Sequence, residues 1–74
     1  MGKADIKMIH VSLDQIVGQR EVLEEQVSMF DGVRVARFSN SRKHWLVVVY
    51  DSDSISSSTI LNQVQLWDRD AFFF

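Results

Sequence analysis

The sequence contains no cysteine and no proline, and only three of its 74 residues are glycine. The lack of cysteine excludes disulfides, thiolate metal ligands and cysteine nucleophiles. No apolar run approaches the ~20 residues that span a membrane, and polar residues follow Met1 too closely for a secretory signal. These absences predict a protein of the cytoplasm with no membrane partner.

Strong charge of either sign is also missing, because the formal net charge is −2 at pH 7. A chain so nearly neutral is not expected to bind nucleic acid by general electrostatic attraction. Its 46% hydrophobic and 24% charged residues are typical of a folded globular domain. We expect one domain over residues 1–74. So short a chain buries only about 60% of its unfolded surface, which makes good packing or oligomerisation important.

Four segments have the alternation and residue types of β-strands. They are residues 5–12, 33–38, 44–51 and 71–74. The valines at 47–49 predict that the third strand is central and covered on both sides. In the first strand, Ile9 and Val11 share one parity while Met8 and His10 share the other, so the two pairs should face opposite sides of a sheet.

Residues 16–29 have the periodicity of an amphipathic helix. The apolar stripe consists of Ile16, Leu23, Val27 and Phe30. Asp14 is the candidate N-cap of this helix, and Gly32 supplies a signal for its end.

A second helix is predicted to begin after Ser56, a typical N-cap residue. Ile55 and Ile60 are placed for a hydrophobic staple around this cap. The expected buried stripe is Ile60, Leu61, Val64 and Trp67. The polar residues 68–70 should end the helix before the last strand.

The predicted order of elements is β-α-β-β-α-β, which is the α+β, ferredoxin-like plan. In this sandwich, two helices cover one face of a four-stranded antiparallel sheet. Right-handed crossovers place the first and third strands in the centre. Ile9 and Val11 should then face the helices, while Met8 and His10 should lie on the open face.

Several short motifs resemble those of the heavy-metal-associated domain, the small module of copper chaperones and of the tails of metal-pumping ATPases. The second half carries most of the resemblance, in Val48-Val49-Tyr50-Asp51, Ile55-Ser56, Ile60-Leu61 and Val64. In the first half, Val11 stands where the family has the valine before its metal loop. Gly32-Val33 stands where the family has Gly-Val after its first helix.

The resemblance places the family's two metal-binding cysteines at Ile16 and Gln19. Neither side chain can replace a thiolate, which is the ligand that soft Cu(I) prefers. The glycine and lysine that follow the family's second helix correspond here to Asp68 and Arg69. The resemblance therefore implies the fold of the family without its metal site, and no bound cofactor.

Other ligand types remain as weak candidates for a metal site. Met8 and His10 lie on one parity of the first strand, but two ligands are too few for a closed site. Met29 and His44 are further candidates that nothing in the sequence brings near. An alternative hypothesis is therefore a domain that binds or transports metal ions through Met8 and His10, with the site shared across a dimer.

Catalysis finds little support in the residues. The segment 51–53 begins like a calcium loop but lacks the glycine and the final glutamate that such a loop needs. Arg20 and Asn40 only faintly resemble the arginine and asparagine of acylphosphatases, which share the predicted topology. With no Ser–His–Asp spacing either, we predict that the protein is not an enzyme.

The C-terminal run Phe72-Phe73-Phe74 is the least expected feature of the sequence. On a strand, its side chains must point to both faces of the sheet. The last strand also lacks the lysine or proline that protects edges, whereas Arg34 and Arg37 guard the other edge. We expect self-association or a protein partner at the strand-4 edge or the open face, with Met8 and His10 beside the phenylalanines.

Overall fold

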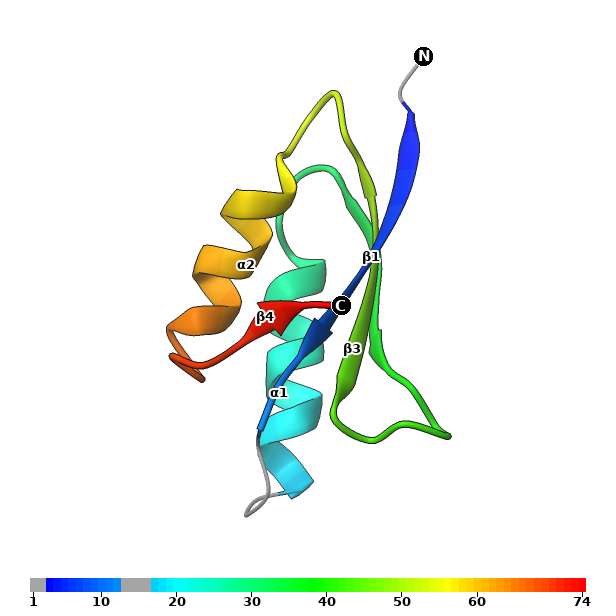
Figure 1. Ribbon diagram of the computed structural model, residues 1–74. Coiled ribbons are helices and arrows are strands. Elements are labelled where there is room, and N and C mark those ends of the chain that lie inside the picture. The colour runs from blue at the N-terminus through cyan, green and yellow to red at the C-terminus, as the bar shows by residue number, and fades with distance from the viewer. Residues whose placement is uncertain (1–2, 13–16) are drawn as a thin grey trace.

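A computed structural model describes residues 3–12 and 17–74 of the chain, with residues 17–19 described by their backbone alone. The elements are β1 (Ala4–His10), α1 (Val17–Ser28), β2 (Val33–Phe38), β3 (Trp45–Asp51), α2 (Ser57–Gln65) and β4 (Phe72–Phe73). The strands form one antiparallel sheet in the order β2-β3-β1-β4. Both helices lie on the same side of this sheet (Figure 1). The ferredoxin-like fold predicted from the sequence is confirmed.

Strand β3 is one of the two central strands of the sheet, as its valine run predicts. The prediction that both of its faces are covered is wrong, because the helices cover only one face. Strand β3 pairs with β1 from Ala4↔Asp51 to His10↔Trp45, and on its other side with β2. An irregularity in the β2 pairing falls between Val33 and Val35. Alternate residues of β3 are buried, so the strand presents one face to the helices and the other to the open side of the sheet.

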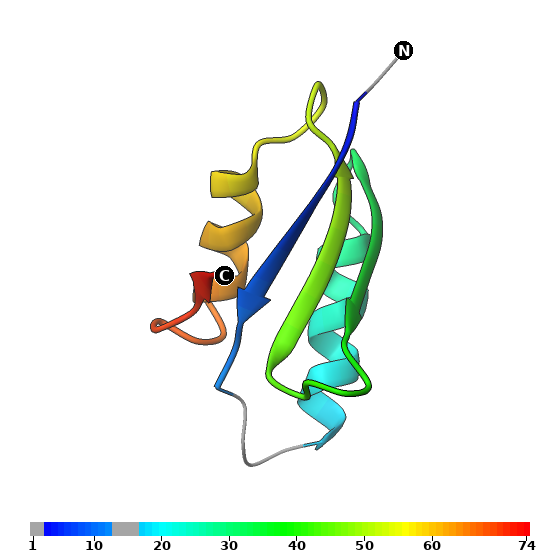
Figure 2. The same ribbon diagram turned by 45° about the vertical axis from the view of Figure 1, so that its right-hand side comes forward.

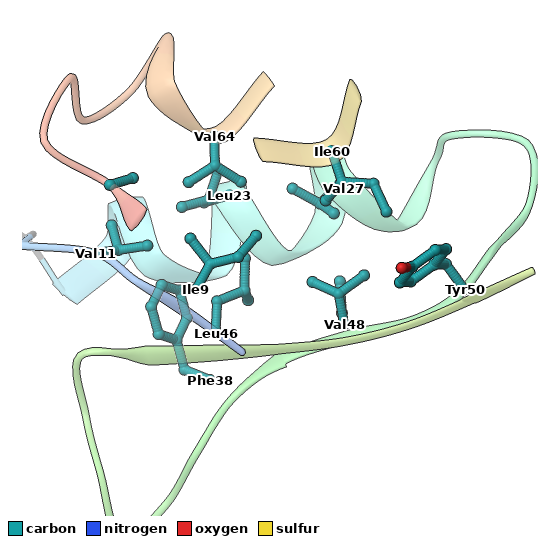
Figure 3. Packing of buried hydrophobic residues seen from close by; sticks show 12 residues of the cluster. Ile9, Val11, Leu23, Val27, Phe38, Leu46, Val48, Tyr50, Ile60 and Val64 are labelled. Carbon is teal, nitrogen blue, oxygen red and sulfur yellow. The ribbon is translucent and has the colours of Figure 1, made fainter. Parts of the chain in front are cut away.

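The core lies between the sheet and the two helices (Figure 3). Its buried members are Ile9, Val11, Leu23, Val27, Ala36, Phe38, Leu46, Val48, Tyr50, Ile60, Val64 and Ala71. The sheet contributes every second residue of its strands, and each helix contributes residues four apart. The predicted inward parity of Ile9 and Val11 is therefore confirmed.

Helix α1 is shorter at its C-terminus than the apolar stripe suggested. Leu23 and Val27 are buried, but the helix ends at Ser28 and Phe30 lies in the turn that follows. Phe30 remains partly exposed and is not a core residue, so the prediction that it lines the core is wrong. The predicted positions Asp14 and Ile16 lie outside the described residues.

Helix α2 begins as predicted. The Ser56 hydroxyl accepts a hydrogen bond from the backbone N–H of Thr59 at 3.2 Å, which satisfies one of the free donors of the first turn. Ile60 and Val64 are buried against the sheet. Trp67 was predicted to continue this stripe, but it follows the helix end and is 38% exposed.

Strand β4 is shorter than the predicted segment 71–74. It pairs with β1 only at Ile9↔Phe73 and His10↔Phe72. The N-terminal part of β1 therefore has β3 on one side and no paired strand on the other among the described residues (Figure 2). The edge that β4 itself offers to a partner is two residues long, which is too short to support an extended sheet by itself.

Candidate functional site

The side of the sheet opposite the helices carries a continuous set of apolar and aromatic side chains, which we name the open face. Its members are Ile6, Met8, His10, Val35, Trp45, Val47, Val49, Phe72 and Phe74. Ile6 is 63% exposed, Phe72 50% and Phe74 80%. Large apolar side chains with this much exposure are unusual when they gather on one surface of a monomer.

Strand register arranges the open face in rows across the sheet. Ile6 lies opposite Val49, and in the next row Met8 lies opposite Val47. The backbone N–H of Phe74 donates to the carbonyl of Met8 at 2.8 Å, which extends that row to the C-terminal segment. Cross-strand neighbours on one face have Cβ atoms about 5 Å apart, so these rows form one surface.

The charged residues of the open face lie at its margins. Arg37 stands opposite Val47 on the β2 side, and Asp51 stands opposite Ala4 at the end of β3. The apolar rows between these margins come from the two central strands. A partner surface that covers the middle of the face therefore does not have to bury a charge of this chain.

Aromatic rings form the row nearest the β2–β3 turn. The ring of His10 stacks on Phe72 with centroids 4.9 Å apart, and the edge-to-face contact with Trp45 has the same separation. Trp45 also meets the ring of Phe74 at 5.3 Å. Such ring pairs add to the stability that burial alone supplies, so this corner of the open face is preorganised.

Histidine 44 joins this row, although the sequence did not indicate it. Its ring lies 5.7 Å from that of His10, centroid to centroid, and the Nδ1 atom of His44 is 3.1 Å from the carbonyl oxygen of Val11. The Nδ1 atom of His10 is buried and has no hydrogen-bond partner among the residues that the structure describes. The antiparallel register of β1 with β3 brings the two histidine rings together, because it pairs His10 with Trp45, the residue next to His44.

The three terminal phenylalanines divide between the two faces, as the alternation of a strand requires. Phe72 and Phe74 belong to the open face, whereas Phe73 packs against the core and has the Lys7 ammonium 5.7 Å from its ring centroid. Phe73 therefore contributes to stability, and only its two neighbours are available to a partner.

A hollow beside β2 brings together the two residues that resemble those of acylphosphatases. Its lining comprises Arg20, Glu21, Glu24, Phe38 and Asn40. The Glu24 carboxylate accepts the N–H of Phe38 at 2.6 Å, and the Arg20 guanidinium lies 4.9 Å from the centroid of the Phe38 ring. The carboxylates of Glu21 and Glu24 in the lining would repel a phosphate ligand. The hydrogen bond from Phe38 to Glu24 also covers part of the edge of β2.

The two positions that the resemblance assigns to metal ligands do not suit a soft metal ion. Ile16 lies outside the described residues, and the side chain of Gln19 is not described, but neither residue is a thiolate. Across residues 3–12 and 17–74, no three histidine, aspartate or glutamate side chains gather as metal ligands. Asp68 instead accepts the backbone N–H of Ser12 at 2.6 Å, so it ties the end of α2 to the segment that leads into this loop.

No protein-family model matches the sequence, and no curated protein is significantly similar to it. Solved structures do share the fold. A proposed copper-ion-binding protein from Bacillus anthracis superposes with a TM-score of 0.79 and 14% sequence identity over 100% of both chains. Oxidized MerP from Ralstonia metallidurans has a TM-score of 0.74 and 12% identity over 97% of this chain and 96% of its own. No helix in the described part of the chain could span a membrane.

Proposed function

We propose that this chain is a non-enzymatic domain of the heavy-metal-associated type that has lost the thiolate site and binds a protein through its open face. The observation that carries the proposal is the exposed apolar surface built by β1, β3 and the C-terminal segment. Phe74, 80% exposed at the margin of that surface, is its most accessible aromatic residue. A surface of this kind is typical of a protein–protein contact.

Metal binding by this fold would need ligands that suit the metal ion. The solved structure from Bacillus anthracis is that of a proposed copper-ion-binding protein, and Cu(I) favours thiolate ligands. This chain has no cysteine anywhere in its sequence. The function that we propose for this fold therefore depends on its exposed surface and not on thiolate ligands.

The open face also suits a protein better than a nucleic acid. Its rings contact one another, as in the stack of His10 on Phe72, and the net charge of the chain is −2. Single-stranded nucleic acids favour basic grooves that follow the phosphate backbone. Apolar rows with charges at the margin correspond to the core and rim of a protein interface.

A photo-crosslinking experiment tests the proposed function in cells of the protein's source. A photoreactive phenylalanine analogue replaces Phe74 in one variant and Leu66 in the control, which is 78% exposed beyond α2. We expect a defined protein adduct from position 74 and none from position 66. The purified adduct partner should bind the wild-type domain and lose at least about tenfold in affinity with Phe74→Lys, the effect of removing an aromatic hot spot.

Equal crosslinking from positions 66 and 74, or none from either, would contradict the proposed function. A partner that binds Phe74→Lys as tightly as wild type would also contradict it. Leu66→Lys supplies the matched binding control, because it places the same charge at an equally exposed apolar site away from the open face. Circular dichroism of both variants separates loss of binding from loss of fold.

A second candidate function is binding of a metal ion through His10, His44 and Met8. The specific observation is the 5.7 Å separation of the two imidazole rings. Beside it, the buried Nδ1 atom of His10 has no hydrogen bond within the described part of the chain. Imidazole suits Zn(II) and Cu(II), and the thioether of methionine suits Cu(I). Two imidazoles do not complete a four-coordinate site, so a second chain would have to supply further ligands.

Calorimetric titration with Zn(II) and with Cu(I) distinguishes this candidate. Binding of one ion per two chains that disappears in His10→Gln would support it, because glutamine keeps much of the shape of the side chain and removes the imidazole. Binding that persists in His10→Gln, or no binding by the wild type, would exclude His10 as a ligand.

A further inference from the structure

We propose that the partner on the open face is a second copy of this chain, in a two-fold dimer whose sheets pack face to face. This inference rests on the proposed function and names its partner. The two-fold axis runs parallel to the strands, between β3 and β1. Sheets packed in this way lie about 10 Å apart with their strands within about 30° of each other.

The open face has the extent that a stable dimer needs. A standard interface buries about 800 Å² on each partner, and the surface of this domain totals 5035 Å². The interface would therefore occupy about a sixth of the molecule. The domain measures 39 × 22 × 21 Å, so a broad face can supply this area whereas the two-residue edge of β4 cannot.

The rows of the open face are self-complementary about this axis. The rotation lays β3 of one chain over β1 of the other and keeps each row at its own height. Val49 then meets Ile6 of the partner subunit, and Val47 meets Met8 of the partner subunit. These residues already lie opposite each other within one sheet, so the dimer repeats existing apolar pairings between the two layers.

The positions of the charged residues favour this axis over an axis perpendicular to the strands. The rotation lays β2 of one chain over the C-terminal segment of the other, which brings Arg37 toward the ring of Phe74 of the partner subunit. A guanidinium above an aromatic face is an attractive contact. Asp51 falls over Ala4 of the partner subunit. An axis perpendicular to the strands through the middle row would instead set Arg37 against its own copy, and like charges at such a distance repel.

The proposed dimer gives a reason for the exposure of the two terminal aromatic residues in the single chain, because association would bury them. Phe72 and Phe74 are 50% and 80% exposed, and in the dimer both lie under the partner's β2 margin. The row of rings around His10 is held by contacts within one chain. A preorganised aromatic surface loses little conformational entropy when it is covered, which favours association.

Sedimentation equilibrium from low to high micromolar concentration tests the dimer. We expect the wild type to form a concentration-dependent dimer and Phe74→Lys to weaken dimerisation at least about tenfold. Leu66→Lys should dimerise as the wild type does. A wild type that stays monomeric at high micromolar concentration would overturn the inference, as would a dimer that Phe74→Lys leaves unchanged.

Single cysteine variants test the axis, because the chain has no native cysteine. Val47 lies one strand spacing sideways from its copy, across sheets about 10 Å apart, which is too far for a direct disulfide. A short bis-maleimide reagent that spans about 10 Å should therefore crosslink Val47→Cys into a dimer. Arg37 lies at the margin, three strand spacings or about 14 Å sideways from its copy, and Arg37→Cys should not be crosslinked. Crosslinking of Arg37→Cys would show the perpendicular axis and contradict the proposed one.

The outcomes separate this inference from the proposed function. A monomeric wild type that still crosslinks a different protein from position 74 leaves the proposed function standing and rejects the self-dimer. A monomer with no adduct from position 74 rejects both. A dimer that Phe74→Lys dissociates supports both, and the adduct from position 74 should then contain a second copy of the chain.

Discussion

Replacement of Leu23 by alanine is expected to destabilise the domain by about 2–5 kcal/mol, the usual cost of truncating a buried leucine. Leu23 is fully buried between α1 and the sheet, one turn before Val27. A protein of this size has little stability to lose, since folded domains are stable by only about 5–15 kcal/mol. Urea denaturation followed by circular dichroism measures the change as a lower midpoint at an unchanged slope.

Phe30→Ala is the matched control for this prediction. Phe30 continues the same apolar stripe in the sequence, but it lies beyond the end of α1 and outside the core. We expect its truncation to cost about 1–2 kcal/mol, less than that of Leu23, because Phe30 is only partly buried and lies outside the core. If Phe30→Ala destabilised the domain as much as Leu23→Ala, the structure would be wrong about which residues α1 buries.

The contrast between Leu23 and Phe30 shows how far the sequence predicts the core. Helical periodicity correctly identified Leu23, Val27, Ile60 and Val64, because residues four apart lie on one face of a helix. It failed at Phe30, because a regular pattern continues past the residue where the helix stops. Helix ends depend on local turn geometry as well as on hydrophobicity, and they are the least certain part of any such prediction.

The candidate site was partly predictable for a similar reason. Strand alternation alone places Met8 and His10 on the other face of the sheet from Ile9, and it divides the terminal phenylalanines between the two faces. It cannot bring His44 to His10, because that contact depends on the register between strands that lie far apart in the sequence. The length of β4 was also unpredictable, because a run of phenylalanines has the same strand propensity whether all of its residues or only some of them pair with β1.

The resemblance to heavy-metal-associated domains predicted the fold better than the site. Hydrophobic motifs around Tyr50 and Val64 are consequences of packing, so they indicate the fold and not the chemistry of a surface. The resemblance places the family's cysteines at Ile16 and Gln19, and neither residue is a thiolate. Asp68, which the resemblance aligns with a glycine of the family, instead accepts a hydrogen bond from the backbone N–H of Ser12 at 2.6 Å.

Replacement of Gly32 by alanine is expected to destabilise the domain by about 2–4 kcal/mol, from backbone strain and steric overlap together. Gly32 has φ +94°, a conformation that residues with a side chain rarely adopt. A Cβ atom added there would lie 2.8 Å from Cβ of Ser54 and 3.0 Å from Cγ2 of Ile55. Thermal or urea unfolding of Gly32→Ala against wild type measures the loss.

A double substitution separates the two causes of this loss. Ser54→Gly removes the nearest atom that the new methyl group would meet, and it leaves the backbone angle at position 32 unchanged. If overlap contributes, Gly32→Ala with Ser54→Gly should be more stable than the sum of the single changes predicts, by about 1 kcal/mol, within the usual range for residues in contact. Strict additivity would assign the loss to backbone strain and to the contact with Ile55. A Gly32→Ala protein as stable as wild type would show that α1 and β2 are joined by a different turn.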